Sequence, residues 1–339
     1  MASTRAAASS CENAGTLREL TLVPDADLLC PVVDTVAELL RAAPGLHLFE
    51  TGVRLENADS LPLLRKQPPF GPPLRLIRAD ISYLAAHDWQ NVADGLPMHT
   101  TIESVVFTEW PEVPVQSDAL VAALLSLPQL RSVSIFSAYA QGHVSVLAHL
   151  AGHPALRSLC RWGDGGQPLF DSAASADLFC NTLRANPHIE MLTFNNIGLW
   201  YNMAAGTALM TTLQTLPSLK KLQLSYNGVQ PEHAAAAGTL VGALILNAPG
   251  LKSLVISFTY VGNADLGPIY DALPHARQLE TLDCLGSVSN AFARDRILPA
   301  VRACAPLRHL SMGAYQPSDP SILAAMRMLE KRRRLDPRH

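Results

Sequence analysis

A short leucine-containing phrase recurs along the chain at a nearly fixed interval. Its clearest copy, LKKLQLSY, begins at Leu219. Leu222 and Leu224 are two residues apart, which places them on one face of a strand, while Lys221 and Gln223 fall on the other. The phrase therefore predicts a β-strand with one apolar and one polar face.

Ten further copies share this pattern of apolar positions. The eleven phrases begin at Leu17, Leu46, Leu74, Ile102, Leu130, Leu156, Ile189, Leu219, Leu251, Leu279 and Leu307, at intervals of 26 to 33 residues. Between phrases, apolar residues recur in helical steps, as at Leu209 and Leu213 or Leu240 and Leu244. A proline precedes most of the later phrases and ends the helix before it. The chain is therefore predicted to alternate strand and helix.

The frame L-x-x-L-x-L at this period resembles the leucine-rich repeat family. The long unit, with a helix after each strand, is similar to the ribonuclease-inhibitor-type subfamily. Repeat eight matches the family's longer pattern at Asn227, Val229, Leu240 and Leu244, and repeat seven has Asn195 or Asn196 at the asparagine position. In repeat eight, Asn227 is expected to turn the chain by bonding to nearby backbone. The resemblance covers residues 17 to about 333.

The predicted fold class is α/β, a right-handed βα solenoid shaped as a leucine-rich repeat horseshoe. Right-handed crossovers place all helices on one face of a parallel sheet. Helices are wider than the strand spacing, so the sheet is expected to be concave and the helices convex. Residues 1–16 are predicted to be a disordered leader, and residues 17–339 one domain of about eleven repeats.

One face of the sheet is expected to remain uncovered, because polar residues alternate with the leucines. These residues are Ser132, Ser134, Lys221, Gln223, Ser225, Ser253, Ser257, Thr281, Asp283 and Ser311. Parallel strands buried on both faces read instead as continuous apolar runs.

Composition narrows the classes of partner and compartment. The net charge of −3 does not favour nucleic acid or an acidic membrane as a partner. The chain has no run of 18 apolar residues and no apolar signal-peptide core. Its six cysteines form no C-x-x-C pair, and Cys284 and Cys304 are expected to be reduced core residues. A cytoplasmic location is predicted, or a host cytosol if the protein is a secreted effector.

The sequence contains no catalytic motif of the hydrolase, metalloprotease or phosphate-loop type. His143, His149 and His153 are spaced by six and four residues, which does not place all three on one helical face. They are expected to be surface or capping residues. The chain is therefore predicted not to be an enzyme, and neither a cofactor, a metal nor a small-molecule substrate is expected.

Aromatic residues gather where the predicted strands end. Trp and Tyr are enriched in protein interfaces because they bury much area at a small entropic cost. The predicted partner-binding residues are Phe136, Trp162, Trp200, Tyr226, Phe258 and Tyr260, together with Lys221, Gln223 and Asp283 on the inner face. The alternative is that several of these aromatics fill the gap between a strand end and the next helix.

The resemblance implies a scaffold that binds a protein partner through its concave face and strand-end rim. The Ala- and Pro-rich composition and Ser/Ala-rich leader are similar to those of bacterial effectors with such repeats. One alternative is a GTPase-activating protein of the Ran-regulator type, whose family has an acidic tail where this chain ends in basic residues. Another is a substrate adaptor of a ubiquitin ligase, although an F-box-like segment does not precede the repeats.

Overall fold

A computed structural model gives the fold of the chain. It describes residues 19–22, 48–51, 76–79, 86–98, 100, 102–107, 110–111, 114–136, 143–163, 168–257, 262–285, 288–311 and 320–334. The chain divides into two compact units, residues 1–139 (unit 1) and residues 140–339 (unit 2). The leader at residues 1–16 lies outside the described residues, and the single domain at residues 17–339 stays a prediction.

The described residues of unit 1 include five strands, each parallel to the next in the chain. They are β1 (Glu19–Leu22), β2 (Leu48–Thr51), β3 (Leu76–Ala79), β4 (Ser104–Phe107) and β5 (Ser132–Phe136). Its described helices are α3 (Ala86–Gly95), the 3-10 turn η4 (Leu96–Met98) and α4 (Pro114–Leu125).

Unit 2 alternates helix and strand throughout. Its strands are β6 (Ser158–Trp162), β7 (Met191–Asn195), β8 (Lys221–Leu224), β9 (Ser253–Ser257), β10 (Thr281–Leu285) and β11 (His309–Ser311). Its main helices are α5 (His143–Ala151), α6 (Ala173–Ala185), α7 (Met203–Leu213), α8 (Ala234–Asn247), α9 (Asn263–Ala272), α11 (Leu298–Ala303) and α12 (Pro320–Arg334). The short helical segments are η5 (Pro231–His233), η6 (Leu273–His275), α10 (Asn290–Phe292) and the π-helical η7 (Ala293–Ile297).

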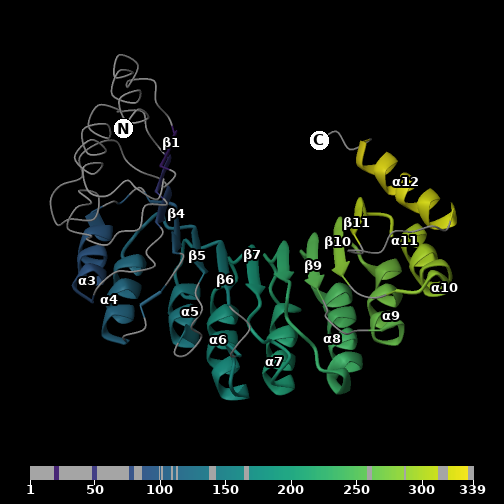
Figure 1. The fold of residues 1–339 in the computed structure, drawn as a ribbon, viewed down its shortest axis with the longest axis horizontal. Coiled ribbons are helices and arrows are strands. Elements are labelled where there is room, and N and C mark those ends of the chain that lie inside the picture. Colours follow the sequence, from purple (N-terminus) through teal and green to yellow (C-terminus); the bar gives the residue numbers. More distant parts are fainter. Residues whose placement is uncertain are drawn as a thin grey trace, which may run out of the picture. The chain divides into compact units, whose positions relative to one another are not determined.

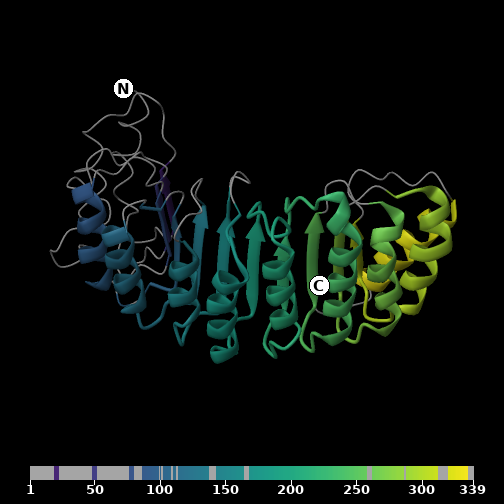
Figure 2. The same ribbon diagram turned by 90° about the horizontal axis from the view of Figure 1, so that it is seen from below.

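The strands of unit 2 form one parallel sheet in chain order, from β6 to β11. Helices α6 to α9 all lie on the same side of this sheet (Figure 1 and Figure 2). An all-parallel sheet with helices between successive strands confirms the predicted βα solenoid. None of the described helices has the length and hydropathy needed to cross a membrane.

Within each unit the strand register confirms the repeat assignment, because the fourth residue of each phrase lies opposite its counterpart in the next strand of that unit. In unit 1 these residues are Leu20, Phe49, Ile77, Val105 and Val133. In unit 2 they are Leu159, Leu192, Leu222, Leu254, Leu282 and Leu310. The weaker N-terminal phrases therefore follow the same frame as the later ones.

Burial alternates along the strands as the polar pattern predicts. In β8, Leu222 and Leu224 are buried, whereas Lys221 is exposed and Gln223 is half-buried. Ser225 differs from the expected pattern, because it is only 4% exposed. The strand ends at Leu224, so Ser225 belongs to the turn and not to the open face.

The helices of repeats eight and nine approach each other closely at two glycines of α8. A Cβ atom on Gly238 would lie 1.9 Å from the Asp265 carbonyl oxygen, and one on Gly242 would lie 2.6 Å from that of Pro268. Cβ atoms do not approach backbone atoms this closely, so only glycine fits at either position without a shift of the helices. The α8 helix extends over 14 residues.

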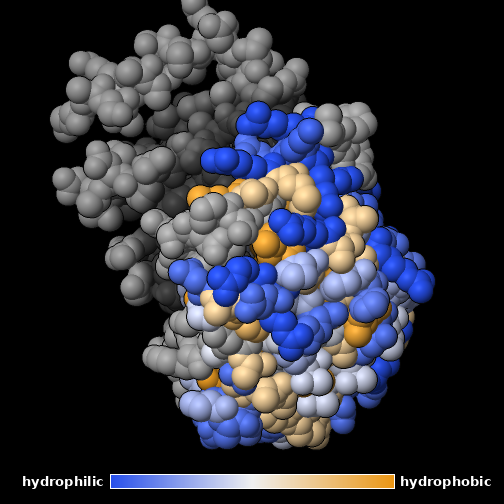
Figure 3. Space-filling model, turned by 90° about the vertical axis from the view of Figure 1, so that its right-hand side faces the viewer, coloured by the Kyte–Doolittle hydropathy of each residue, from blue (hydrophilic) through white to orange (hydrophobic). Residues whose placement is uncertain are grey.

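The basic residues near the C-terminus lie at the end of helix α12. Helix α12 packs on α11 and β11, and its Leu329 is only 3% exposed. Arg332 Nη1 donates to the Cys304 carbonyl oxygen at 2.8 Å. Figure 3 faces this end of unit 2, where hydrophilic side chains surround smaller apolar areas. A polar terminal cover is what a solenoid needs, since its last repeat has no neighbour to bury its apolar side.

Candidate protein-contact surface at the strand ends

The backbones of three successive repeats are joined where β6, β7 and β8 end. The Gly163 amide donates to the Asn195 carbonyl oxygen at 2.9 Å, and the Asn196 amide donates to that of Ser225 at 2.9 Å. Asn196 Nδ2 also donates to the Gly163 carbonyl oxygen at 3.1 Å. We refer to residues 162–163, 195–196 and 225–227 as the strand-end edge.

Asn227 fastens this edge to the preceding repeat. Its Oδ1 accepts from the amides of Ile197 at 3.0 Å and Leu199 at 3.3 Å, and its Nδ2 donates to the Phe194 carbonyl oxygen at 2.7 Å. The side chain is fully buried. The sequence predicted bonds to nearby backbone, but only a longer contact of 3.4 Å to the Ser225 carbonyl oxygen is local. The asparagine therefore acts mainly between repeats.

Two aromatic rings project from this edge and meet each other. Trp162 is the last residue of β6, and Tyr226 lies two residues after the end of β8. Their ring centroids are 5.8 Å apart with an angle of 34° between the ring planes. Trp162 is 36% exposed and Tyr226 is 56% exposed. These two residues, the aromatic pair, form an apolar spot that remains accessible to a partner.

Tyr226 adopts a backbone conformation that disfavours its side chain. Its φ is 61°, and Asn196, at the same place in the preceding repeat, has a φ of 54°. Asparagine tolerates this left-handed region, whereas an aromatic residue there is an outlier. Repeats seven and eight thus share this turn geometry, but only repeat seven has the residue that fits it best, Asn196.

A buried arginine lies beneath Trp162. Arg161 is 1% exposed, and in the register it is opposite the buried Phe194. Its Nη1 donates to the Trp162 carbonyl oxygen. Other phrases of unit 2 have an apolar residue or cysteine at this position, so the signal was visible in LRSLCRW, but sequence reasoning did not use it.

The structure corrects the expectation for Trp200, which is only 1% exposed. Its ring packs over Gly206 of α7, where a Cβ atom would lie 3.2 Å from Trp200 Cε3. Trp110 is likewise buried and donates from Nε1 to Ser117 Oγ at 2.8 Å. For Trp200 the alternative therefore holds, since its ring packs against a helix and is not exposed.

The structure describes four of the other predicted contact residues. Phe136 is half-buried at the end of β5 in unit 1. Phe258 and Tyr260 lie outside the described residues. On the open face of unit 2, Lys221 is exposed, and Gln223 and Asp283 are half-buried.

Burial has made several ionisable groups less reactive. It raises the pKa of the Cys284 thiol to about 12 and the pKa of the neighbouring Tyr270 phenol well above its usual value. It also raises the pKa of the Cys180 and Cys304 thiols. Buried, protonated thiols are poor nucleophiles. Cys284 and Cys304 are free core residues, as predicted.

Histidines and acidic residues do not assemble into a metal site within the described part of the chain. His149 is exposed, and its Nδ1 lies 2.7 Å from the Ser145 carbonyl oxygen. His153 is buried, and its Nδ1 accepts from the Ala155 amide at 3.2 Å. His149 is thus a surface residue, as the sequence predicted, whereas His153 is buried and accepts a bond within the turn that follows α5.

No family model matches this chain. No curated protein sequence matches it either. Among solved structures, a Bacteroides fragilis protein has a TM-score of 0.43 at 14% identity, covering 73% of this chain and 76% of its own. A Toll-like receptor 13 chain from a complex with single-stranded RNA has a TM-score of 0.35 at 10% identity, covering 80% of this chain and 46% of its own. The actin-binding site 2 of leiomodin-1 has a TM-score of 0.31 at 14% identity, covering 38% of this chain and 73% of its own.

Proposed function

We propose that this chain is a leucine-rich repeat protein of the ribonuclease-inhibitor type that binds another protein and catalyses no reaction. The contact surface comprises the open face of the unit 2 sheet and the strand-end edge. The observation that carries the proposal is Tyr226, an exposed aromatic residue with a φ of 61° whose ring meets Trp162.

The energetics of Tyr226 favour a role in binding over a role in stability. A non-glycine residue in an unfavourable backbone region costs about 1–3 kcal/mol. Its ring is more than half exposed, so burial within the chain offsets little of this cost. Exposed tryptophan and tyrosine side chains are the residue types that most often dominate the binding energy of protein interfaces. A partner that covers the pair would recover the missing burial.

The open face offers area around this anchor. Typical stable interfaces bury about 800 Å² on each partner. The half-buried and exposed polar residues of β8 and β10 would form the rim of such an interface, where contacts contribute little individually. The described residues provide no observation that favours a Ran-type GTPase-activating protein or a ligase adaptor over a plain binding scaffold.

The test compares variants of the aromatic pair in binding to a captured protein. The full chain is used as bait, a captured protein is purified, and its affinity is measured by calorimetry. Trp162→Ala and Tyr226→Ala are each expected to weaken binding about 30-fold, the effect of a typical hot-spot residue. Leu178→Ala is the matched control, because Leu178 is 51% exposed on helix α6.

Thermal unfolding of the same variants separates binding from stability. All three should melt within a few degrees of the parent chain, because their side chains are exposed. Unfolding of the Trp162→Ala variant would show that this ring belongs to the core and that the proposed contact surface is wrong. Equal affinities for the parent and both aromatic variants would also reject the proposal.

A further inference from the structure

The second residue of every phrase is charged or histidine. These residues are Arg18, His47, Arg75, Glu103, Arg131, Arg157, Glu190, Lys220, Lys252, Glu280 and Arg308. The last six belong to unit 2 and lie just before the strands, and we call them the charged row.

A hydrogen-bond ladder fixes the backbone of the charged row. The Arg157 carbonyl oxygen accepts from the amides of Glu190 at 2.8 Å and Met191 at 3.0 Å. The carbonyl oxygens of Glu190, Lys220, Lys252 and Glu280 each accept the same pair of hydrogen bonds from two successive amides of the next repeat. The ladder uses only main-chain atoms, so it holds the row in line without requiring a charge at any position.

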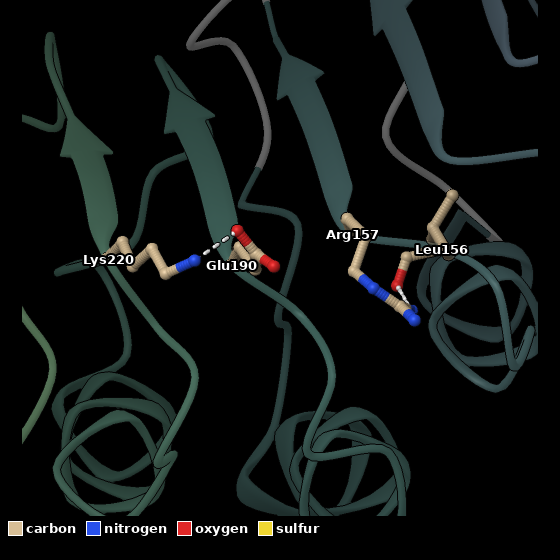
Figure 4. Close-up of polar contacts among 4 residues, drawn as sticks. All are labelled: Leu156, Arg157, Glu190 and Lys220. Atoms are coloured by element: carbon tan, nitrogen blue, oxygen red, sulfur yellow. Dashed lines mark hydrogen bonds and ion pairs between the residues drawn. The ribbon is translucent and has the colours of Figure 1, made fainter.

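The side chains of Arg157, Glu190 and Lys220 lie along the edge where their strands begin (Figure 4). Lys220 Nζ is 2.7 Å from Glu190 Oε2, and their side chains are 51% and 41% exposed. Lys252 Nζ is 3.3 Å from Glu280 Oε1, with 42% and 32% exposure. Ion pairs this exposed contribute only about 0–1 kcal/mol each. Fold stability therefore gives little reason for a charge in every repeat.

The row and its neighbour Lys221 are predominantly cationic. Arg157, Lys220, Lys221, Lys252 and Arg308 oppose only Glu190 and Glu280, whereas the whole chain has a net charge of −3. Lys221 is exposed on the open face, next to the row. The summed charges of such an edge produce a positive potential even where single pairs are formed.

We propose that the partner presents an acidic protein segment to the charged row while an apolar side chain of the same partner covers the aromatic pair. This inference rests on the proposed function and adds the chemistry of the partner. Lys221 begins β8 and Tyr226 follows two residues after its end, so the strand alone, at about 3.3 Å per residue, separates them by about 10 Å. One acidic segment with an apolar anchor spans that distance across the open face.

Two other occupants are less suited to the row. A phosphate backbone is negative throughout and would meet Glu190 and Glu280, whereas a protein can place neutral or basic side chains opposite them. A second copy of the chain could offer its acidic half, since residues 1–139 have 9 Lys and Arg against 16 Asp and Glu, and residues 140–339 have 17 against 13. Such a head-to-tail contact would continue from copy to copy. Both are outcomes of the test.

The probe is a displayed library of random 12-residue peptides, selected against the full chain. Selected peptides are synthesised with a fluorophore, and their dissociation constants are measured by polarisation at low and high salt. We expect peptides enriched in Asp and Glu, with affinity that falls at least 10-fold for the Lys220→Glu, Lys221→Glu, Lys252→Glu variant. Peptides in which Lys replaces Asp and Glu should regain affinity for that variant.

The matched control reverses three exposed arginines elsewhere in unit 2, as Arg277→Glu, Arg302→Glu and Arg327→Glu. It changes the net charge equally but should leave peptide affinity within about twofold. Should the triple lysine variant not fold, Lys221→Glu alone tests the same point, with a loss of about threefold expected. An unchanged affinity for that single variant would overturn the proposal.

The outcomes separate this inference from the proposed function. If the selected peptides are not enriched in acidic residues but bind the Trp162→Ala variant more weakly, the acidic partner is wrong and the proposed binding function stands. Selected peptides indifferent to both Trp162→Ala and Tyr226→Ala would reject the scaffold surface itself. If a labelled single-stranded RNA 20-mer binds more tightly than the selected peptides, the partner is a nucleic acid and not a protein segment. If sedimentation velocity shows self-association and the triple lysine variant abolishes it, the occupant is a second copy of the chain.

Discussion

Trp162 and Tyr226 lie two repeats apart, yet their ring centroids are separated by only 5.8 Å. The repeat between them places Asn196 at the position that Tyr226 occupies, so a small side chain leaves room for the two rings to meet. The turn geometry shared by Asn196 and Tyr226 directs the tyrosine ring towards solvent at the strand-end edge.

This geometry predicts that Tyr226→Asn is more stable than Tyr226→Ala. Both changes remove the ring contact with Trp162, but only asparagine tolerates a φ of 61°. We expect a difference of about 1 kcal/mol in the free energy of unfolding, measured by urea titration. Both variants should lose partner affinity equally. Equal stabilities would show that the turn does not strain Tyr226.

Leu222→Ala is expected to lower the free energy of unfolding by about 2–5 kcal/mol, because it opens a cavity in the leucine seam. Leu222 is 1% exposed and pairs in register with Leu192 and Leu254. Gln223→Ala, one residue on but on the open face, should change stability by less than about 0.5 kcal/mol. Similar losses for the two variants would contradict the assignment of inner and outer faces.

Asn227→Ala should cost about 3 kcal/mol or more in the free energy of unfolding. It removes the bonds to the Ile197 and Leu199 amides and to the Phe194 carbonyl oxygen, leaving buried polar groups without their partner. Asn247→Ala is the control, since Asn247 is exposed and bonds Gln214 Oε1 at 3.2 Å. Chemical denaturation of both variants checks the prediction, which a near-neutral Asn227→Ala would reject.

Gly238→Ala is expected to destabilise unit 2 by about 3 kcal/mol, because its Cβ would collide with the Asp265 carbonyl oxygen and push α8 away from α9. Gly267→Ala in α9 meets no atom within 4 Å and should gain up to about 1 kcal/mol from helix propensity. Thermal unfolding of the pair measures this contrast. A tolerated alanine at residue 238 would mean that the two helices are further apart.

Cys284 should resist alkylation in the native protein. Burial raises the pKa of its thiol to about 12, so iodoacetamide at pH 8 should label the half-buried Cys160 first and Cys284 only after unfolding. The unfolded thiol ionises near pH 9 while the native one does not, so unfolding becomes easier as the pH rises from about 9 to about 12. Mass spectrometry of peptides from labelled native protein checks this, and modified Cys284 there would contradict it.

Sequence reasoning predicted the strands and their faces well, because both depend on local periodicity. The spacing of Leu219, Leu222 and Leu224 fixes which side chains can share a face, and the register confirms it. Exposure of Trp162 and Tyr226 at strand ends was also correct. The burial of Arg161, whose guanidinium donates to the Trp162 carbonyl oxygen, was not foreseen, because it depends on packing between strands.

The sequence by itself determined the period of the repeat, the alternation of faces and the residue types at the strand ends. Only the tertiary structure decided which aromatics are anchors and which are fillers. Trp200 is buried because Gly206 of the following helix leaves a ring-sized space against it, whereas the turn at Tyr226 directs that ring outward. Such space is set by how closely two backbones approach, and a linear pattern of residue types does not contain that distance.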